Sequence, residues 1–385
     1  MKIIYFSSTF FADCDFPLIR EMQRQGHDVR YYIPVASFNL KSTLLDLGRI
    51  YPHTGIYPAT IYEGFKVYEN EIDLSKVYVV NQKHKQKYHP LNLLLMLRLV
   101  LHFIRQKTDV IHLTNEPTLM TKLLYIVKDK LVLTVHDPFL HSSSFNNKWE
   151  KRRKKAYSNI KKLVLLNKTQ IDAFCRHYKI PRSHVFICKL GAYDSISRIT
   201  PQPHNIPKPY ILFFGGINKY KGLDYLMEAM LKVYEKYPNL KLVVAGGGKI
   251  WFDIGKYKEY PCFEFRHYYV GVEELAGLLE GCEFSVCPYR DATQSGVVQT
   301  ALSMGVPLIV TNVGALPEVV IDGIYGKVVE PNNVDALAEA ICELHGNANR
   351  LNLMRKNIKD YWLPNMSWNP IVDKYIKCYM TNIES

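Results

Sequence analysis

Residues 210–226 read YILFFGGINKYKGLDYL, and this stretch decides the fold. It begins with the apolar run Tyr210–Phe214, which is typical of a short buried strand, and it ends by opening a helix. Between the two, Gly215 and Gly216 allow a ligand to approach the backbone, and Lys221 stands just before the helix. This order suits a diphosphate, because the free N–H groups of a helix N-terminus attract anions. On spacing alone, a tight turn beside a solvated lysine fits equally well.

Short apolar strands alternate with amphipathic helical stretches on both sides of this segment. This alternation predicts parallel sheets covered by helices, so the fold class is α/β throughout. Residues 36–90 show no clean period and are expected to form loops and short elements. The other expected elements are strands at Ile3–Phe6, Val29–Ile33, Val110–Leu113, Leu131–Val135, Lys162–Leu166, Leu240–Ala245, Phe284–Cys287 and Pro307–Val310, and helices at Pro17–Gln25, Leu91–Gln106 and Met366–Met380.

The chain of 385 residues has the length of two domains of about 150 to 200 residues each. Four prolines between Pro201 and Pro209 disfavour both helix and strand and predict a stiff connector. We therefore expect an N-terminal domain over residues 1–200, a linker over 201–209 and a C-terminal domain over 210–365. The segment 366–385 is expected to be a helix that returns to the first domain.

The composition, with 48% hydrophobic and 22% charged residues, is that of a globular protein. The longest apolar run, Leu93–Ile104, is interrupted by Arg98 and His102 and is shorter than the roughly 20 residues of a membrane span. The N-terminus leads directly into a strand without the pattern of a signal peptide, so we expect a cytoplasmic protein. The cysteines show no C-x-x-C or zinc spacing and are expected to be free thiols; they are Cys14, Cys175, Cys188, Cys262, Cys282, Cys287, Cys342 and Cys378.

The net charge of +13 is concentrated in the first domain, because residues 1–200 hold 31 Lys and Arg against 16 Asp and Glu. The densest clusters are Lys83, Lys85 and Lys87, and the run Lys151–Lys155. This asymmetry favours an anionic partner such as a phospholipid surface, and a solvated basic face fits equally well. Nucleic acid is the least favoured partner, because no recognition helix or RNP-like strand is present. The apolar helix Leu91–Gln106 fits a membrane interface and a core helix equally.

A second motif, Pro288-Tyr289-Arg290-Asp291-Ala292-Thr293-Gln294-Ser295-Gly296, joins the strand at Phe284 to a helical stretch that ends near Met304. The free N–H groups of Ser295, Gly296 and Val297 should face the carboxyl edge of the sheet, where open α/β sheets bind ligands. The helix dipole adds partial positive charge at this point. A second anion-binding position is therefore expected here.

Four strings in this order and spacing resemble the donor domain of GT-B glycosyltransferases of retaining family 4, which includes many bacterial surface-polysaccharide enzymes. They are FFGGINKYKGLDYL, LVVAGGG, PYRDATQSGVVQTALSMGVPLIVTNVGALPEVV and GKVVEPNNVDALAEAI, and the resemblance covers residues 210–345. It implies two Rossmann-like domains that face each other across a cleft. The first domain would bind the acceptor and the second a nucleotide-sugar, either a UDP-sugar or a GDP-sugar, with no metal ion.

The resemblance also implies roles for single residues. Lys221 and the N–H groups of Ser295 and Gly296 would hold the donor diphosphate, and Arg266, His267 and Tyr268 would lie along the nucleobase. Two departures alter this pattern, because the usual F-x-G-R arginine is Gly216 and the E-x7-E glutamates are Ala292 and Thr300. Asp291 or Gln294 would then reach the sugar hydroxyls, and Gln299 or Thr300 the ribose, since each can hydrogen-bond a hydroxyl. The full donor set is Gly215, Gly216, Lys221, Arg266, His267, Tyr268, Asp291, Gln294, Ser295, Gly296, Val297 and Thr300.

In the first domain His136 follows the strand Leu131–Val135, and the family has a histidine near the transferred sugar at this position. His136 and Lys221 are therefore the expected catalytic residues. Ser7, Ser8 and His141 are expected on the acceptor side. Asp13-Cys14-Asp15 matches the D-x-D metal motif formally, but it lies at a helix start in the wrong domain, and a lysine and helix amides already neutralise the diphosphate.

The expected function is transfer of a hexosyl unit from a nucleoside diphosphate sugar to an acceptor hydroxyl, with retention of configuration. The acceptor would be a lipid-linked oligosaccharide at the inner membrane face, which the basic first domain would contact. The alternative is a catalytically inactive GT-B homologue that binds sugar nucleotides as a scaffold, because both E-x7-E glutamates are missing.

Overall fold

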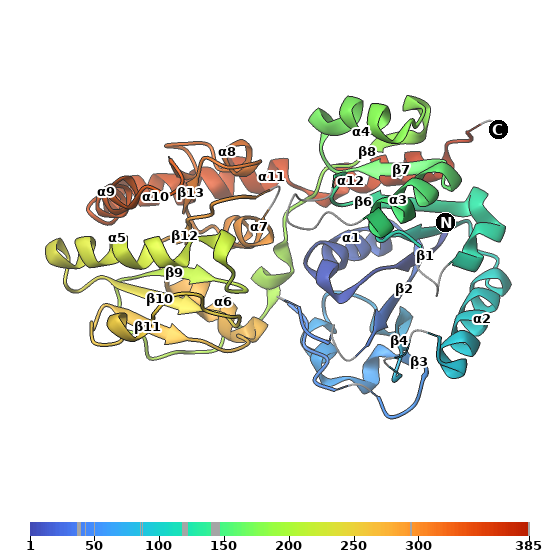
Figure 1. Ribbon diagram of the computed structural model, residues 1–385, viewed down its shortest axis with the longest axis horizontal. Coiled ribbons are helices and arrows are strands. Elements are labelled where there is room, and N and C mark those ends of the chain that lie inside the picture. Colours follow the sequence, from blue (N-terminus) through green and yellow to red (C-terminus); the bar gives the residue numbers. More distant parts are fainter. Residues whose placement is uncertain are drawn as a thin grey trace. The chain divides into compact units, whose positions relative to one another are not determined.

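The computed structural model describes residues 1–36, 40–42, 44–49, 51–84, 86, 88–117, 122–139, 147–292 and 295–383. The chain divides into two compact units, one comprising Met1–Gly191 and Ser367–Ser385 and the other Ala192–Met366. Each unit has its own sheet and core (Figure 1). The Pro-rich segment 201–209 lies inside the second unit, where the N–H of Gln202 donates to the carbonyl of Glu273 at 2.9 Å.

The first unit contains an eight-stranded sheet in the order β3-β4-β2-β1-β5-β6-β7-β8. All neighbours are parallel except β3 and β4, which pair antiparallel. The strands are β1 Lys2–Phe6, β2 Asp28–Val35, β3 Gly55–Pro58, β4 Val77–Asn81, β5 Val110–Leu113, β6 Leu131–Val135, β7 Lys162–Leu165 and β8 Val185–Ile187. The α-helices are α1 Ala12–Arg24, α2 Pro90–Arg105, α3 Asn147–Asn159, α4 Ile171–Tyr178 and α12 Trp368–Met380.

The second unit contains a fully parallel six-stranded sheet in the order β11-β10-β9-β12-β13-β14. The strands are β9 Tyr210–Phe214, β10 Lys241–Ala245, β11 Phe263–Arg266, β12 Ser285–Cys287, β13 Leu308–Thr311 and β14 Gly326–Val329. The α-helices are α5 Leu223–Lys236, α6 Val272–Gly281, α7 Gly296–Ser303, α8 Leu316–Val319, α9 Val334–His345, α10 Ala348–Asn357 and α11 Leu363–Asn365. In chain order the strands run 3-2-1-4-5-6, the order of a dinucleotide-binding Rossmann sheet.

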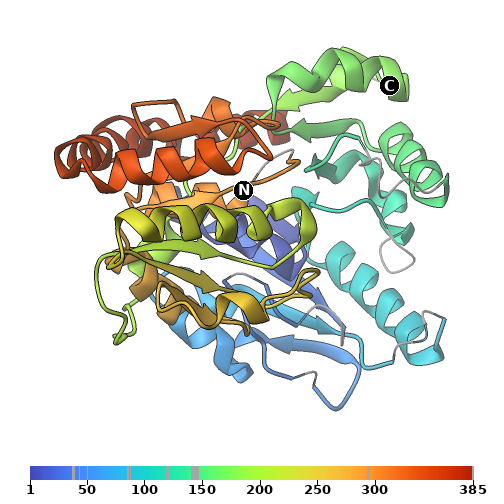
Figure 2. The same cartoon turned by 60° about the vertical axis from the view of Figure 1, so that its left-hand side comes forward.

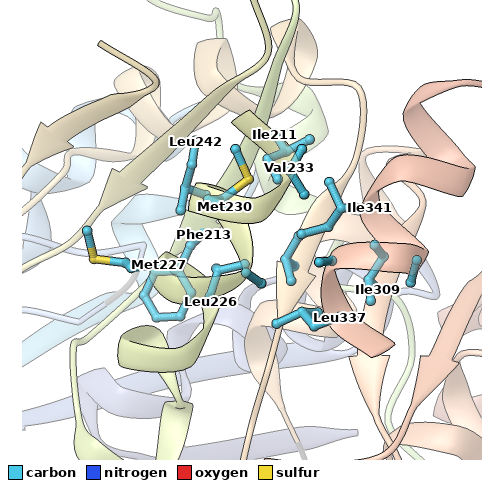
Figure 3. Packing of buried hydrophobic residues seen from close by; sticks show 14 of the residues in the cluster. Ile211, Phe213, Leu226, Met227, Met230, Val233, Leu242, Ile309, Leu337 and Ile341 are labelled. Carbon is cyan, nitrogen blue, oxygen red and sulfur yellow. The ribbon is translucent and has the colours of Figure 1, made fainter. Parts of the chain in front are cut away.

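Helices α5 and α9 cover the same face of the second sheet. Figure 3 shows Met227 and Met230 of α5 and Leu337 and Ile341 of α9 packed toward strand residues that include Phe213. Figure 2 shows α5, in yellow-green, lying over the strands of this sheet. Full burial of an aliphatic side chain of this size contributes about 1.5–3 kcal/mol, so this layer fixes the loops at the strand ends.

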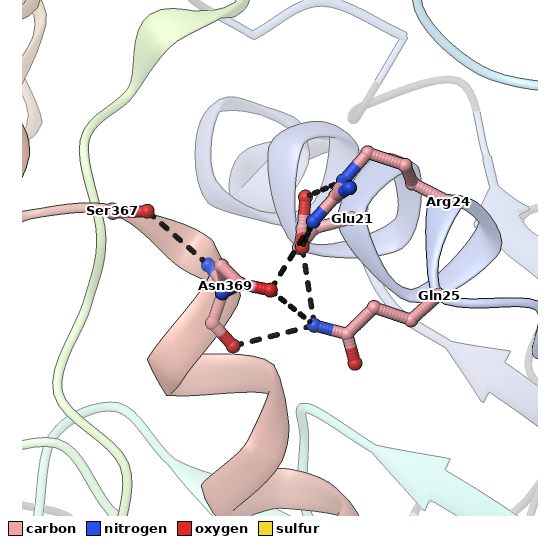
Figure 4. A network of polar contacts seen from close by, with 5 residues as sticks. All are labelled: Glu21, Arg24, Gln25, Ser367 and Asn369. Atoms are coloured by element: carbon pink, nitrogen blue, oxygen red, sulfur yellow. Dashed lines mark hydrogen bonds and ion pairs between the residues drawn. The ribbon is translucent and has the colours of Figure 1, made fainter.

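Helix α12 belongs to the first unit, although it is the last helix of the chain. It packs against α1, and Figure 4 shows the Asn369 side chain facing the ends of the Arg24 and Gln25 side chains of that helix. Arg24 Nη2 donates to Asn369 Oδ1 at 3.2 Å, and Gln25 Nε2 donates to the same oxygen at 2.9 Å. The side chain of Ser367 caps the helix by accepting from the N–H of Asn369.

One expectation for the first unit needs correction, and it concerns α1. Residues 36–90, expected to form loops and short elements, contain the short strands β3 and β4, and β4 pairs with β2 and thereby buries Val77, Val79 and Val80. Helix α1 begins at Ala12 rather than at Pro17, and its buried first turn contains Asp13 and Asp15. No helix among the described residues is long and apolar enough to cross a bilayer.

Candidate functional site

The second sheet reverses its strand order between β9 and β12, and the loops after these two strands therefore leave in opposite directions. Open α/β sheets bind ligands in the crevice that this reversal creates at the carboxyl ends of the strands. The loop after β9 contains Gly215, Gly216 and Lys221, and the loop after β12 leads into α7 at Gly296. The glycine and lysine motif after β9 and the N-terminus of α7 thus lie at the same edge of this sheet.

Glycines bring the loops after β9 and β10 into direct backbone contact. A Cβ on Gly246 would lie 2.1 Å from the carbonyl oxygen of Gly215, and one on Gly248 would lie 2.3 Å from that of Ile217. The N–H of Ile217 donates to the carbonyl of Gly247 at 2.7 Å. A larger side chain at Gly246 or Gly248 would push the two loops apart. The glycines of the LVVAGGG string therefore allow the contact that fixes the turn before Lys221.

Lys221 is a buried cation, with only 8% of its surface exposed. Its Nζ lies 5.4 Å from the ring centre of Tyr289, and a Cβ on Gly215 would lie 3.2 Å from Nζ and 3.1 Å from Cγ2 of Val297. The lysine amine therefore lies beside the first turn of α7. Burial lowers its pKa, and no ion pair of Lys221 is found within the described part of the chain. A buried ammonium group without a carboxylate partner is suited to an anionic ligand.

Arg290 ties the loop after β12 to the turn that contains Lys221. Its Nη2 donates to Asp224 Oδ2 at 2.6 Å, its Nη1 donates to the carbonyl of Lys219 at 2.9 Å, and its guanidinium lies 4.8 Å from the ring centre of Tyr225. The N–H of Arg290 also donates to the carbonyl of Tyr220 at 2.6 Å. These bonds fix the 3-10 turn η10, Lys219–Lys221, relative to the start of α7.

Helix α7 begins with Ser295 as its N-cap, whose Oγ accepts from the N–H of Val298 at 3.3 Å. Ser295 Oγ in turn donates to the hydroxyl of Tyr289 at 3.3 Å. The N–H groups of Gly296 and Val297 belong to the first turn and have no acceptor within the helix. With Lys221 beside it, this helix start concentrates positive potential at the strand reversal. Gln294 lies outside the described residues.

The expected nucleobase loop after β11 is held by Glu274 of α6. Its Oε1 accepts from Arg266 Nη1 and from the Tyr268 hydroxyl, both at 2.7 Å. His267 Nε2 lies 2.8 Å from the carbonyl of Gly248 in the loop after β10. The ring of Tyr268 is 47% exposed, so a flat aromatic surface is available at the end of this strand.

The residues that replace the two family glutamates differ in exposure. Ala292 is half-buried, whereas Thr300 is wholly buried on α7, and Asp291, the neighbour of Ala292, is exposed. Thr300 Oγ1 and Gln299 Oε1 are enclosed and have no hydrogen-bond partner among the described residues. Two unsatisfied oxygens in adjacent residues of one helix are unusual, because a buried polar atom without a partner costs about 1–3 kcal/mol.

His136 follows β6 in the first unit and stacks on Phe11, with ring centres 3.7 Å apart and planes 8° from parallel. The residue is half-buried, and Nε2 is enclosed and has no hydrogen-bond partner among the described residues. Burial lowers the pKa of His136 to about 3. The imidazole is therefore neutral at physiological pH and acts as a hydrogen-bonding group.

The first sheet reverses its order between β1 and β5, and Ser7 and Thr114 follow these two strands. Thr114 Oγ1 donates to Ser7 Oγ at 2.6 Å, and Ser8 Oγ accepts from the N–H of Phe10 at 3.4 Å. Both serines thus fix the loop after β1, which also contains Phe11. The other acceptor-side residue, His141, lies outside the described residues.

Asp13 and Asp15 both lie in the buried first turn of α1. Asp15 accepts from the hydroxyls of Tyr5 at 3.0 Å and Tyr31 at 2.9 Å, whereas Asp13 Oδ1 has no partner within the described chain. Burial raises the pKa of each carboxyl to about 7. The D-x-D string here is a pair of carboxyl groups enclosed in the first unit.

Sequence reasoning did not find Arg290, Glu274 or Tyr289. Arg290 belongs to one of the sequence motifs, but its bonding partners Asp224 and Lys219 lie 66 and 71 positions away in the sequence. No local spacing of residues predicts these bonds. Tyr289 carried the clearest signal, since a tyrosine directly after the short strand β12 lies at the carboxyl edge of the sheet.

Both units match glycosyltransferase families. Residues 17–191 match the family model described as Glycosyltransferase Family 4, and residues 208–347 match the model described as Glycosyl transferases group 1. The first matched segment lies in the first unit, and the second lies in the second unit.

Individual relatives agree with these matches. An uncharacterized glycosyltransferase of Methanocaldococcus jannaschii is 29% identical over 45% of each chain. A GDP-mannose-dependent alpha-(1-6)-phosphatidylinositol monomannoside mannosyltransferase of Mycolicibacterium smegmatis is 26% identical over 42% of this chain and 45% of its own length. The chain thus spans about half the length of these curated relatives. The solved structure of Anabaena HepE in complex with UDP-glucose superposes with a TM-score of 0.67 at 14% identity, over 98% of this chain and 99% of that one.

Proposed function

Since residues 17–191 and 208–347 are the two glycosyltransferase domains of a GT-B fold, we propose that this protein transfers a hexosyl unit from a nucleoside diphosphate sugar to a hydroxyl group of an acceptor. The observation that carries the proposal is the buried Lys221 beside the first turn of α7, at the strand reversal of the second sheet. Glycosyl transfer requires departure of an anionic diphosphate from an oxocarbenium-like carbon. Preorganised positive groups on that leaving group lower the barrier most.

The proposed donor site places the diphosphate between Lys221 and the N–H groups of Ser295, Gly296 and Val297. These groups supply positive charge without a metal ion, so the reaction is proposed to be metal-independent. The base of a UDP-sugar or GDP-sugar would lie along Arg266, His267 and Tyr268, where the exposed Tyr268 ring offers a stacking surface. The sugar hydroxyls would be bound by Asp291 and Gln294. Of the two residues expected at the ribose, Gln299 would make the contact, because it is only partly buried and its enclosed Oε1 needs a hydrogen-bond partner, whereas Thr300 is wholly buried.

His136 is the proposed catalytic residue of the first unit. A neutral imidazole with an unpartnered Nε2 can hydrogen-bond a sugar hydroxyl without adding charge to the reaction centre. Ser7, Ser8 and His141 would bind the acceptor, which we propose to be a lipid-linked oligosaccharide. Transfer would proceed with retention, by attack from the face that the leaving group vacates. The protein would act in the cytoplasm, at the inner face of the cell membrane.

A thermal-shift panel of UDP-, GDP- and ADP-sugars tests the donor site. We expect one nucleotide to raise the melting temperature of the wild type, and Lys221→Met to abolish that shift, because a single charged hydrogen bond lost from a buried anion site weakens binding by about 1.5–3 kcal/mol. The matched control is Lys219→Met, which removes an exposed lysine from the same turn. A panel without any shift, or equal shifts in both variants, would overturn the proposed site.

The second candidate function is a sugar-nucleotide-binding scaffold without turnover, which the alanine and threonine at positions 292 and 300 favour. The two functions separate in a hydrolysis and transfer assay on the nucleotide that the panel identifies. Binding that depends on Lys221 together with release of nucleoside diphosphate supports the transferase. Binding of the same strength without release of diphosphate supports the scaffold.

A further inference from the structure

Helix α2 exposes a second apolar face in addition to the face that it buries. Leu95, Leu99, Val100 and Phe103 belong to the core of the first unit. On the opposite side of the helix, five large aliphatic side chains are 41–49% exposed; they are Leu91, Leu94, Leu97, Leu101 and Ile104. A surface helix of a globular protein normally places polar residues there. The outer face of α2, defined by these five side chains, is therefore unexplained by folding alone.

Cations accompany this outer face, and the sequence segment that contains it has no acidic residue. Arg98 and Arg105 are exposed, and each follows a leucine of this face, Leu94 or Leu101, by four residues, or about one turn. Tyr88, which is 70% exposed, lies just before the helix. Residues 74–108 contain no aspartate or glutamate. The charge of this segment is thus complementary to an anionic surface.

The neighbouring element extends the same pattern. The 3-10 segment η5, Lys122–Lys130, packs against α2. It exposes Ile126, at 74%, and its exposed charges are Lys122, Lys128 and Lys130 against one acid, Asp129. An isolated exposed isoleucine needs no explanation, but one beside an apolar helix face and another lysine continues a single surface.

A pocket of about 210 Å³ opens between β3 and α2. Ile56, Leu91, Leu94 and Leu95 line it with aliphatic carbon, and Arg98 is its charged wall. An aliphatic pocket with a guanidinium at one side fits a phospholipid. Its acyl chain would contact the aliphatic side chains, and its phosphate would contact the arginine. Figure 1 shows α2, in cyan, beside β3 and β4.

We propose that the outer face of α2 docks this protein on an anionic phospholipid bilayer. The helix would lie in the plane of the interface, with its leucines in the acyl boundary and Arg98 and Arg105 at the phosphates. This surface goes beyond the proposed transferase function, because it involves none of the donor-binding residues. Its sixteen residues are too short to span the bilayer, and an interfacial helix does not need to.

A second copy of the chain is the competing occupant, since Leu94, Leu97, Leu101 and Ile104 follow the 3-4-3 spacing of a helix-pairing seam. A symmetric pair of α2 helices would bring two copies of Arg98 and two copies of Arg105 into one interface. No carboxylate between residues 74 and 108 would neutralise them, and like charges in an interface disfavour association. An anionic bilayer provides acyl chains for the leucines and phosphates for the arginines.

Co-sedimentation of the full chain with vesicles tests the proposal. We expect strong binding to phosphatidylcholine vesicles that contain about 30% phosphatidylglycerol, weak binding to phosphatidylcholine alone, and weaker binding as salt rises from about 0.1 M to 0.5 M. Leu97→Gln/Leu101→Gln should weaken binding at least tenfold. Arg98→Gln/Arg105→Gln should weaken it about twenty-fivefold on anionic vesicles, about fivefold for each arginine.

Matched variants control for general effects of apolarity and charge. Leu353→Gln removes an exposed leucine from α10 of the second unit, and Lys154→Gln/Lys155→Gln removes two exposed lysines from the other basic cluster. Both controls should bind vesicles like the wild type, and all variants should keep the wild-type melting temperature within a few degrees. Vesicle binding that survives both α2 variants, or that is lost with the α3 lysines instead, would place docking elsewhere and overturn the proposal.

Light scattering, which measures the mass of the protein in solution, tests whether a second copy of the chain occupies the outer face of α2. A dimer that dissociates in Leu97→Gln/Leu101→Gln, with no binding of the wild type to anionic vesicles, would assign the face to a second copy. The nucleotide panel remains independent of these outcomes, because the α2 variants leave Lys221 and α7 intact. Failure of the docking surface and failure of the donor site are therefore distinguishable.

Discussion

Asp13 is a buried carboxyl group whose protonation should set part of the pH dependence of stability. Burial raises its pKa from 3.8 to about 7, and Oδ1 has no hydrogen-bond partner among the described residues. Between pH 4 and 7 the folded chain keeps this proton while the unfolded chain has lost it. Unfolding therefore releases the proton, and the contribution of Asp13 to stability falls as pH rises through this window.

Asp13→Asn should stabilise the protein at pH 8 and change little at pH 4, because the amide has the same shape and never ionises. A pKa shift of about three units corresponds to about 4 kcal/mol, which is an upper limit for the gain at pH 8. Urea denaturation at the two pH values measures it, and Asp129→Asn, at an exposed position of the same unit, is the control. Equal effects of Asp13→Asn at both pH values would contradict the assignment.

At the residue scale, the sequence predicted the positions that local pattern determines. Lys221 and Ser295 each stand at a strand-to-helix junction, and such a junction is visible in the spacing of apolar residues. Burial was not visible, because it depends on which elements pack together. Thr300 was expected to contact ribose but is wholly buried, and the partners of Arg290 come from η10, α5 and the loop after β14.

Gly222 connects η10 to α5 in the donor site, and its substitution tests whether the relative position of these elements matters for nucleotide binding. Its φ of +68° disfavours other residues, and a Cβ there would lie 2.0 Å from the carbonyl oxygen of Pro288. Gly222→Ala must therefore separate the start of α5 from the loop that precedes α7. Because Lys221 is the adjacent residue, we expect a loss of stability of at least about 2 kcal/mol together with weaker nucleotide binding.

Gly305→Ala separates the effect of backbone conformation from that of the clash. Its φ of +72° is nearly the same, but no atom lies within 4 Å of a Cβ built there. This variant should lose only about 1 kcal/mol and should keep the full nucleotide shift. Chemical denaturation and the thermal-shift panel measure both quantities. If the two alanine variants behave alike, the contact between Gly222 and Pro288 does not fix the site.

Elements with a strong local period were predicted well, and elements held by tertiary pairing were not. Strands β5, β6 and β9 occur at the expected residues, since each is a short and mostly apolar run. Strand β3 is half exposed and forms only by antiparallel pairing with β4, so its sequence gave no clear alternation. Helix α2 was predicted in position, and the ambiguity between core and interface arose because the helix is apolar on two opposite faces.

At the scale of the whole molecule, the division of the chain follows packing more closely than composition. Proline density predicted a boundary at 201–209, but residues from Ala192 onward already belong to the second unit. The 3-10 segment Asp194–Arg198 packs against α6 and α7 there, and Ser195 and Ile196 are buried. Prolines restrict the backbone without preventing burial, so their density does not by itself locate a domain boundary.

Helix α12 supplies part of the core of the first unit, although it follows the second unit in the sequence. Trp368, Ile371, Val372, Tyr375 and Tyr379 are all buried. The hydroxyl of Tyr379 lies 2.5 Å from His112 Nδ1, and Lys162 Nζ donates to the carbonyl of Tyr379 at 2.7 Å. Five such side chains contribute on the order of 10 kcal/mol, which is comparable to the whole stability of a domain.

Truncation after Met366 should therefore unfold the first unit and leave the second unit folded, since residues 192–366 keep their own sheet and core. Hydrogen exchange measured peptide by peptide should show rapid exchange in β1, β5 and β6 and wild-type protection in β9, β10 and β12. Truncation after Met380 is the control, because it removes only residues beyond the helix. Wild-type protection of β5 in the shorter chain would mean that α12 is dispensable, and loss of protection in β9 would mean that the second unit does not fold by itself.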